Sequence, residues 1–148
     1  MLNKDYNDIL QILLKNKAEF LVIGAYAMSA YGYPRSTGDF DIWVNNSKIN
    51  SLKIYNSLAM FGAPIEKLKT NSFIEENLIF QIGVAPRRID ILTTINGIKF
   101  NEAYNNKRDI KINKLIVPFI SKNDLILNKK STGRDKDILD INYLENKN

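Results

Sequence analysis

Two aspartates separated by a single residue, Asp39 and Asp41, are the side chains of this chain best suited to bind a cation. They alternate with the apolar residues Phe40, Ile42 and Val44, a pattern that predicts a strand with one face in the core. Both carboxylates then project from the other face, where they repel each other unless a cation lies between them. A hard divalent cation such as Mg²⁺ or Mn²⁺ suits such oxygen ligands. The short pattern also fits a simpler interpretation, in which Asp39 caps a turn and Asp41 lies exposed.

A third aspartate, Asp90, lies within another segment that predicts a strand. Ile89 and Ile91 face one side of that strand, while Arg88 and Asp90 face the other. If this strand lies beside the first pair, three carboxylates meet, and they can hold two metal ions ~3.5–4 Å apart for in-line displacement at phosphorus. An aspartate in an apolar strand costs free energy if it is buried unpaired, so a salt bridge from Asp90 to Arg88 or Arg35 is equally open.

A glycine turn precedes the acidic pair. Residues 20–23 are apolar and predict a short strand that runs through Gly24 into the small, apolar residues 25–31. A glycine at such a turn lets backbone N–H groups approach a phosphate closely. Many strand–glycine–helix turns serve packing alone, so the turn by itself does not decide between phosphate binding and packing.

The composition excludes several kinds of site. The 148 residues contain no cysteine and no histidine, which excludes disulfides, thiolate chemistry, a histidine general base and a typical zinc site. Any catalysis therefore falls to carboxylates, Lys, Arg, Tyr or a bound metal. The net charge of +5 favours anionic partners such as nucleotides, RNA or an acidic protein. No apolar run approaches a membrane span and the N-terminus lacks a signal-peptide core, so we expect a cytoplasmic protein with no membrane partner.

The elements that must position these residues alternate between helix and strand. Helical spacing, caps and glycine or proline stops predict helices over 4–16, 25–31, 47–61, 121–132 and 135–145, and a short one within 97–105. Apolar or alternating runs predict strands over 20–23, 40–44, 78–84 and 88–95, and an extended segment over 110–117. This order predicts an α/β (α+β) fold with a mixed β-sheet flanked by helices. We expect a single domain, 1–148, with its core at about 18–118 and a C-terminal helix pair at about 121–146.

Two stretches together resemble the nucleotidyltransferase superfamily, which is related to the palm of DNA polymerase β. They are Val22–Ala27 and Tyr31–Val44, and they contain in order a hydrophobic–Gly–small turn, a short helix, Gly-x-x-Arg-x-Thr and Asp-hydrophobic-Asp. The likeness is greatest to small bacterial members of the AbiEii abortive-infection toxin type, which implies a minimal nucleotidyltransferase fold. In this resemblance Asp90 takes the place of the third family carboxylate, on a later strand.

The C-terminal stretch Asn123–Asp140 resembles the helix pair of the same relatives, in which a Lys is followed by Arg-x-Lys-Asp-x-x-Asp. The resemblance implies that Lys129 approaches the nucleotide phosphates and that Asp137 fixes Lys129 or Arg134. A charged helix pair with ordinary ion pairs is the alternative. The nucleotide- and phosphate-binding residues that the whole resemblance implies are Gly24, Ala25, Arg35, Thr37, Lys129 and Arg134. The metal-binding and catalytic residues that it implies are Asp39, Asp41 and Asp90.

The resemblance implies a metal-dependent nucleotidyltransferase that transfers a nucleoside monophosphate from an NTP to a hydroxyl group. The acceptor it implies is an RNA or tRNA end, a protein or a small molecule, in a toxin–antitoxin or phage-defence setting. The alternative is a catalytically inactive nucleotide- or protein-binding module of the antitoxin kind, because Ala25 stands where many relatives have Ser or Gly. A D-x-D glycosyltransferase fits less well, since such enzymes use a larger domain. Lys107, Arg108, Lys111 and Lys114 either form a basic stripe that binds RNA or are scattered surface charges.

Overall fold

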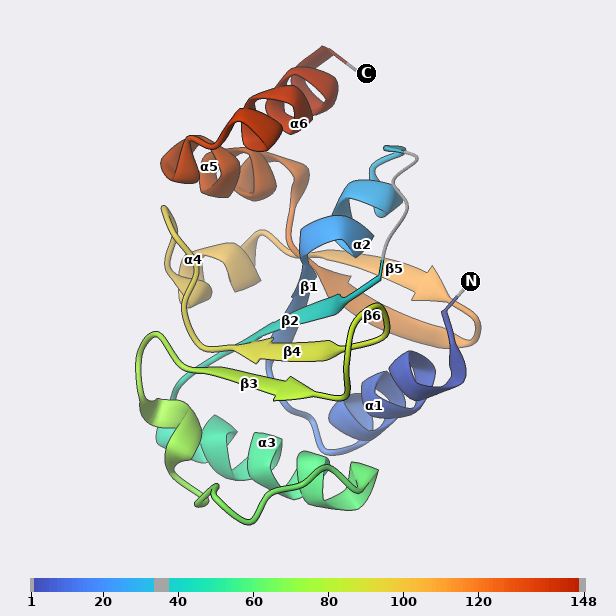
Figure 1. Ribbon diagram of the computed structural model, residues 1–148, viewed down its shortest axis with the longest axis vertical. Coiled ribbons are helices and arrows are strands. Elements are labelled where there is room, and N and C mark those ends of the chain that lie inside the picture. The colour runs from blue at the N-terminus through green and yellow to red at the C-terminus, as the bar shows by residue number, and fades with distance from the viewer. Residues whose placement is uncertain (1, 34–37, 147–148) are drawn as a thin grey trace.

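A six-stranded mixed sheet forms the centre of the computed structural model, which describes residues 2–33 and 38–146 (Figure 1). The strands are β1 (Phe20–Ile23), β2 (Phe40–Val44), β3 (Ile79–Ile82), β4 (Ile89–Leu92), β5 (Arg108–Ile112) and β6 (Leu115–Phe119). Across the sheet they follow the order β3-β4-β2-β1-β6-β5. β2 pairs with β4, and β1 with β6, in parallel, while the other neighbours are antiparallel.

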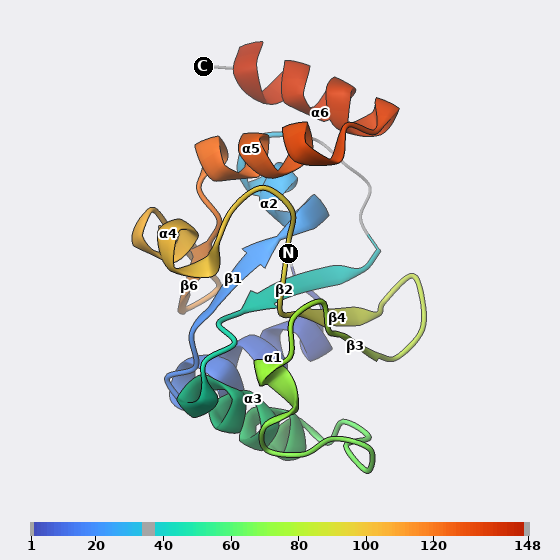
Figure 2. The same cartoon turned by 90° about the vertical axis from the view of Figure 1, so that its left-hand side faces the viewer.

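Helices cover both faces of this sheet. The helices of the described residues are α1 (Lys4–Lys15), α2 (Gly24–Ala30), α3 (Lys48–Phe61), α4 (Phe100–Asn105), α5 (Lys122–Thr132), α6 (Asp135–Asn146) and a 3₁₀ turn, η1 (Ser72–Ile74). α1 and α3 lie on one face, α2, α4 and α5 lie on the other, and α6 packs on α5 (Figures 1 and 2). The expected mixed sheet flanked by helices is confirmed. Within the described part of the chain, no helix is long and apolar enough to cross a membrane.

Alternation along β2 separates the core from the site. Phe40, Ile42 and Val44 are fully buried. Phe40 stacks on Tyr6 of α1 with ring centroids 4.7 Å apart, so this side of the strand faces α1. Asp41 therefore projects to the opposite side, which is the side that α2 and α5 cover.

The helix ends follow the signals in the sequence. The hydroxyl of Ser47 accepts a hydrogen bond from the backbone N–H of Asn50 at the start of α3. Ser121 does the same for Asp124 at the start of α5. Gly133 ends α5 in the left-handed conformation, with φ of 66°. The chain then turns directly into α6.

The region around 110–117 differs from expectation. In place of one extended segment, β5 and β6 form an antiparallel hairpin in which Ile112 pairs with Leu115. Asn113 begins the two-residue turn in the left-handed conformation, with φ of 56°. Asparagine tolerates that conformation better than most residues, and a two-residue turn closes a hairpin tightly. The signal was a single asparagine inside an otherwise alternating run, so the sequence did not reveal the reversal.

Candidate active site

Strand pairing brings the aspartates together. β2 and β4 are parallel neighbours, and Asp41 lies directly opposite Asp90 in their register. Asp39 comes two residues earlier, just before β2 begins. The carboxylates that the sequence placed on two separate strands therefore occupy one corner of the sheet, which we call the acidic corner (Asp39, Asp41 and Asp90).

Arg88 binds two members of the acidic corner. Its Nε lies 2.7 Å from Oδ1 of Asp90, and its Nη2 lies 3.1 Å from Oδ2 of Asp90 and 3.0 Å from Oδ2 of Asp39. The backbone N–H of Arg88 also donates to Oδ1 of Asp39, at 3.2 Å. The salt bridge between Asp90 and Arg88, one of the two open interpretations, is thus present together with the carboxylate cluster. Among the described residues, no group of three or more acidic side chains has the arrangement of a metal site.

The acidic corner carries more negative charge than Arg88 can balance. Burial, together with the charges of Asp90 and Asp39, raises the pKa of Asp41 to about 6, and Arg88 opposes this shift only in part. A carboxylate whose ionised form is this disfavoured gains most from an added cation. Oxygen donors from three aspartates, with a surplus of negative charge, fit a hard divalent ion such as Mg²⁺ or Mn²⁺.

Gly24 lets the glycine turn lie against the acidic corner. Gly24 has φ of 69°, a left-handed conformation that side chains other than glycine rarely adopt. A β-carbon at this position would collide with the carboxylate of Asp41 and would lie 3.2 Å from its Cγ. Both the conformation and the close approach therefore require glycine here. The turn carries the backbone of Gly24 and Ala25 to the wall of the same cleft as Asp41.

Tyr6 holds the two segments that carry the aspartates. Its hydroxyl donates a 2.6 Å hydrogen bond to the carbonyl of Gly38 and lies 3.4 Å from the carbonyl of Arg88. Burial raises the pKa of Tyr6 to about 12, so the phenol stays protonated and remains a donor. Sequence analysis missed this residue, because nothing in the helical pattern of residues 4–16 indicates a contact with residues this distant in the chain.

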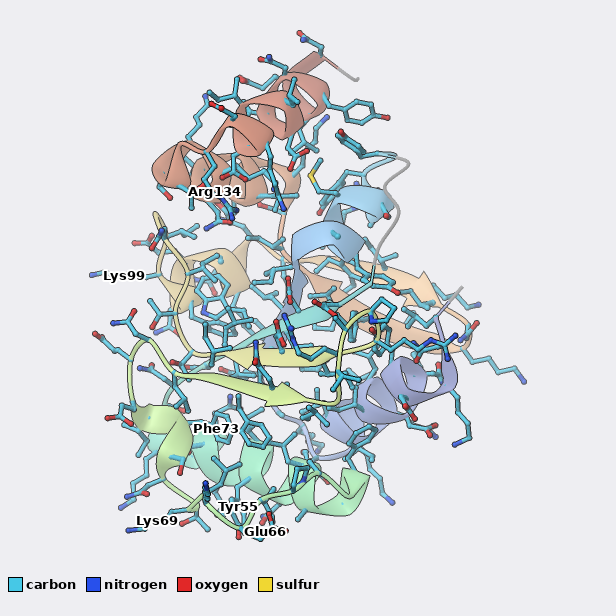
Figure 3. The ribbon with its side chains drawn as sticks, in the orientation of Figure 1. Tyr55, Glu66, Lys69, Phe73, Lys99 and Arg134 are labelled. Carbon is cyan, nitrogen blue, oxygen red and sulfur yellow. The ribbon has the colours of Figure 1, made fainter. Side chains whose placement is uncertain are left out.

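A cleft of about 890 Å³ opens between this edge of the sheet and the C-terminal helix pair. Asp39 and Asp41 line one wall, together with Gly24 and Ala25. Arg134 lies at the connection between α5 and α6 and lines the opposite wall (Figure 3). The other lining residues include Thr94, Asn96, Asn128, Lys129, Ser131 and Lys136. Thr94 and Asn96 belong to no motif that the sequence analysis identified.

The wall opposite the acidic corner belongs to an ion-pair network, which we call the helix-pair network (Lys129, Arg134, Asp137 and Asp140); all of its members except Arg134 are buried. Nζ of Lys129 lies 2.9 Å from Oδ2 of Asp140 and 3.6 Å from Oδ1 of Asp137. Arg134 donates to Asp137 through Nε at 2.7 Å and Nη2 at 3.2 Å. Although burial alone would raise it, hydrogen bonds from Arg134 and Thr132 hold the pKa of Asp137 well below its usual range. Cations and carboxylates are therefore matched in this network.

The sequence-predicted phosphate contacts separate into three groups. Gly24, Ala25 and Arg134 line the cleft, and the Arg134 side chain is 63% exposed, so its guanidinium is accessible to an anion. Lys129 also lines the cleft, but its ammonium is buried and paired within the helix-pair network. Arg35 and Thr37 lie outside the described residues.

Comparisons with known proteins identify the family and the fold of the chain. The family model described as "Nucleotidyltransferase of unknown function (DUF6036)" matches residues 2–145. The fold is similar to that of TM1012, a candidate nucleotidyltransferase from Thermotoga maritima, with a TM-score of 0.62 at 13% identity, covering 100% of this chain and 97% of that one. It is also similar to the lincosamide antibiotic adenylyltransferase LnuA in its lincomycin-bound form, with a TM-score of 0.63 at 14% identity, covering 100% and 99%. No curated protein sequence matches the chain at a significant level.

At such low identities the two structures establish the fold, a minimal nucleotidyltransferase fold, and nothing more specific. The family match extends over nearly the whole chain and includes every residue of the acidic corner and the helix-pair network. The chain therefore belongs to the DUF6036 family of nucleotidyltransferases of unknown function.

Proposed function

We propose that this protein transfers a nucleoside monophosphate from an NTP to a hydroxyl acceptor with the help of a divalent metal ion. The observation that carries the proposal is the acidic corner: three carboxylates with surplus negative charge, two of which, Asp39 and Asp41, line a cleft beside a close-packed glycine turn. Surplus carboxylate charge is costly to a fold unless a cation relieves it. A cytoplasmic location, where NTPs are available, accompanies the proposal.

Asp39 and Asp41 are the proposed metal ligands, and Asp90 completes the set. When bound, Mg²⁺ or Mn²⁺ supplies charge neutralisation of the triphosphate and activation of the attacking hydroxyl. Asp90 is also the proposed acceptor of the hydroxyl proton. Its place opposite Asp41 in the register supports both roles.

The other side of the cleft is the proposed triphosphate site. The backbone of Gly24 and Ala25 lines one wall, from which it would approach the phosphates, and Arg134 would neutralise charge from the opposite wall. The family resemblance adds Arg35 and Thr37 to this set. Lys129 is a weaker candidate for direct phosphate contact, because Asp140 and Asp137 already pair with its ammonium.

The proposed reaction is an in-line displacement. The acceptor oxygen forms a bond to the α-phosphorus, while the bond from that phosphorus to the bridging oxygen of the β-phosphate breaks. Pyrophosphate leaves with the bonding electron pair, and the hydroxyl proton passes to Asp90. The products are the nucleotidylated acceptor and pyrophosphate.

The acceptor class is the least constrained part of the proposal. The similarity to an adenylyltransferase crystallised with lincomycin supports ATP as the first donor to test and a small hydroxyl-bearing molecule as one acceptor class. The other two acceptor classes are RNA or tRNA ends and proteins. Both are in keeping with a toxin–antitoxin setting. All three carry the hydroxyl that the displacement requires.

The experiment is transfer of label from α-³²P-labelled NTPs, with Mg²⁺ and each acceptor class in turn. We expect labelled acceptor and released pyrophosphate with the native protein, and loss of both with Asp39→Asn and Asp41→Asn. Asp109→Asn is the matched control, since Asp109 lies on the far edge strand β5 and its side chain is 52% exposed. Transfer that survives both Asp39→Asn and Asp41→Asn would exclude the assigned site.

A second candidate is a nucleotide-binding module without turnover, and the position of Arg88 favours it. Arg88 occupies oxygens of Asp39 and Asp90 that a metal would need. Calorimetry with ATP and Mg²⁺, run beside a pyrophosphate assay, separates the two candidates. Binding without pyrophosphate release in the presence of any acceptor class supports the module.

A further inference from the structure

The side chain of Arg88 contacts two members of the acidic corner, Asp39 and Asp90. On the basis of the proposed metal site, we infer that Arg88 is an internal counter-cation that a divalent metal ion displaces when it binds. Arg88 then competes with the metal for the same carboxylate oxygens. Its removal strengthens metal binding and weakens the metal-free fold.

Arg88 contacts all four carboxylate oxygens of two aspartates, Asp39 and Asp90. Its guanidinium contacts Oδ1 and Oδ2 of Asp90 and Oδ2 of Asp39, and its backbone N–H contacts Oδ1 of Asp39. A metal ion needs some of these four oxygens at about 2.0–2.1 Å if it is Mg²⁺. Two cations on the same oxygens are a few ångströms apart and repel each other strongly. A metal ion and the guanidinium of Arg88 therefore weaken each other's binding when both occupy the acidic corner.

The side chain of Arg88 is free to leave while the backbone stays in place. Arg88 precedes β4, which begins at Ile89, and its side chain is 28% exposed. Rotation about its side-chain bonds takes the guanidinium toward solvent without disturbing the pairing of β4 with β2. The backbone N–H of Arg88 continues to hold Asp39 after the guanidinium has moved.

Partial charge balance explains why such a residue is useful. Without a metal, three carboxylates at one corner repel one another. One guanidinium relieves part of this repulsion through its contacts with Asp39 and Asp90. A divalent ion carries twice the charge and approaches the oxygens more closely, so it replaces the guanidinium rather than joining it.

The test is a Mn²⁺ titration of the full chain, with free Mn²⁺ followed by electron paramagnetic resonance. We expect Arg88→Gln to bind Mn²⁺ about tenfold more tightly than the native protein, because a bidentate charged pair no longer opposes the metal. Arg88→Lys keeps the charge without the bidentate geometry and is expected to lie between the two. Arg87→Gln is the matched control, a neighbouring exposed arginine with the same change of charge.

A second measurement observes the displacement itself. In ¹H–¹⁵N spectra of the native protein, the Nε–H resonance of Arg88, assigned from its loss in Arg88→Gln, should move on addition of Mg²⁺. The corresponding resonance of Arg87 should not move. This measurement does not depend on how well the variant folds, which thermal unfolding monitors in parallel.

The outcomes separate the inference from the proposed function. Tighter Mn²⁺ binding by Arg88→Gln with a shifted Arg88 resonance supports the inference. Equal or weaker binding by Arg88→Gln, with native binding that Asp41→Asn abolishes, overturns the inference and leaves the metal site standing. If neither the native protein nor Arg88→Gln binds Mn²⁺, both the inference and the proposed metal site are overturned.

Discussion

The two walls of the cleft are both built from charged side chains, but they differ in balance. In the helix-pair network, Lys129 and Arg134 are matched by Asp137 and Asp140, and the pKa of Asp137 is held low. In the acidic corner the carboxylates outnumber their cation, and the pKa of Asp41 is raised. A matched cluster stabilises a fold, whereas an unmatched one is stabilised by what binds there.

This difference teaches which charged residues to regard as structural. Lys129 has the family spacing of a phosphate contact, yet its buried ammonium joins α5 to α6 through Asp140. Arg134 belongs to the same network, but its exposed side chain also faces the cleft. The comparison therefore predicts opposite results for substitutions on the two walls. In the acidic corner a substitution should lower activity with little loss of stability. In the helix-pair network a substitution should lower stability first.

The largest expected effect is that of Asp41→Asn on activity. Removal of a central metal ligand should lower the rate of nucleotidyl transfer on the order of 10³-fold. The free energy of unfolding of the metal-free protein should stay the same or increase, because a repulsive charge is removed. Labelled-NTP transfer and urea denaturation measure the two quantities. A variant that is active, or one that is strongly destabilised, contradicts the contrast between the walls.

The next largest effect is that of Asp137→Asn on stability. This change breaks a largely buried ion-pair network and leaves Arg134 and Lys129 with an impaired partner, so we expect a loss of about 3 kcal/mol in urea denaturation. Asp135→Asn is the matched control, since Asp135 lies exposed in the first turn of the same helix. Equal stability of Asp137→Asn and Asp135→Asn would contradict a structural role for the helix-pair network.

The pH dependence of stability sharpens this prediction. The pKa of Asp137 in the folded protein lies below its ordinary value of 3.8, so the unfolded chain binds its proton more readily. The contribution of Asp137 is therefore fully present above that value and is lost as the pH falls below it. Native protein should lose free energy of unfolding below about pH 4 more steeply than Asp137→Asn. Parallel pH profiles for the two proteins would contradict the depressed pKa.

Gly24→Ala is expected to distort the cleft between the two walls, because it changes the backbone conformation of the glycine turn. The left-handed conformation costs an alanine about 1–2 kcal/mol, and the added β-carbon collides with the Asp41 carboxylate. Gly133→Ala is a close control, because Gly133 has φ of 66° and a β-carbon there meets nothing within 4 Å. Both variants should lose stability, but only Gly24→Ala should also lose Mn²⁺ affinity. Equal Mn²⁺ affinity in the two variants would show that the contact with Asp41 is unimportant.

The smallest expected effect is that of Tyr6→Phe. This change removes the hydrogen bond to Gly38 while the stacking on Phe40 remains, so we expect a loss of about 1 kcal/mol in stability. Transfer activity should fall several-fold, because the two acid-bearing segments lose a shared anchor. Tyr55→Phe on α3, on the same face of the sheet as Tyr6, is the control for removing a tyrosine hydroxyl. Equal transfer activity in Tyr6→Phe and Tyr55→Phe would show that Tyr6 contributes only packing and that its hydroxyl does not position the aspartates.

The sequence predicted those parts of the site that depend on local pattern. Alternation along a strand has a period of two, so Asp41 and Asp90 were placed on polar strand faces before their pairing was known. The caps at Ser47 and Ser121 were also predictable, since a cap is formed within a few residues. The mixed sheet followed from the order of these local elements.

The parts that the sequence did not predict depend on contacts between distant residues. Tyr6 reaches a carbonyl 32 residues away, and no pattern along α1 indicates it. The pairing of Lys129 with Asp140 depends on how α6 folds back over α5. Whether Arg88 would pair with Asp90 was left open, because its spacing permits either a salt bridge or a carboxylate cluster. The structure contains both at once.

The most direct test of the central claim is an anomalous difference map from a crystal soaked with Mn²⁺ and a non-hydrolysable ATP analogue. The account predicts a Mn²⁺ peak among the carboxylates of Asp39, Asp41 and Asp90, with the triphosphate extending toward Gly24 and Arg134. A nucleotide bound in this cleft with no peak at the acidic corner, or a peak at another place on the protein, would contradict it.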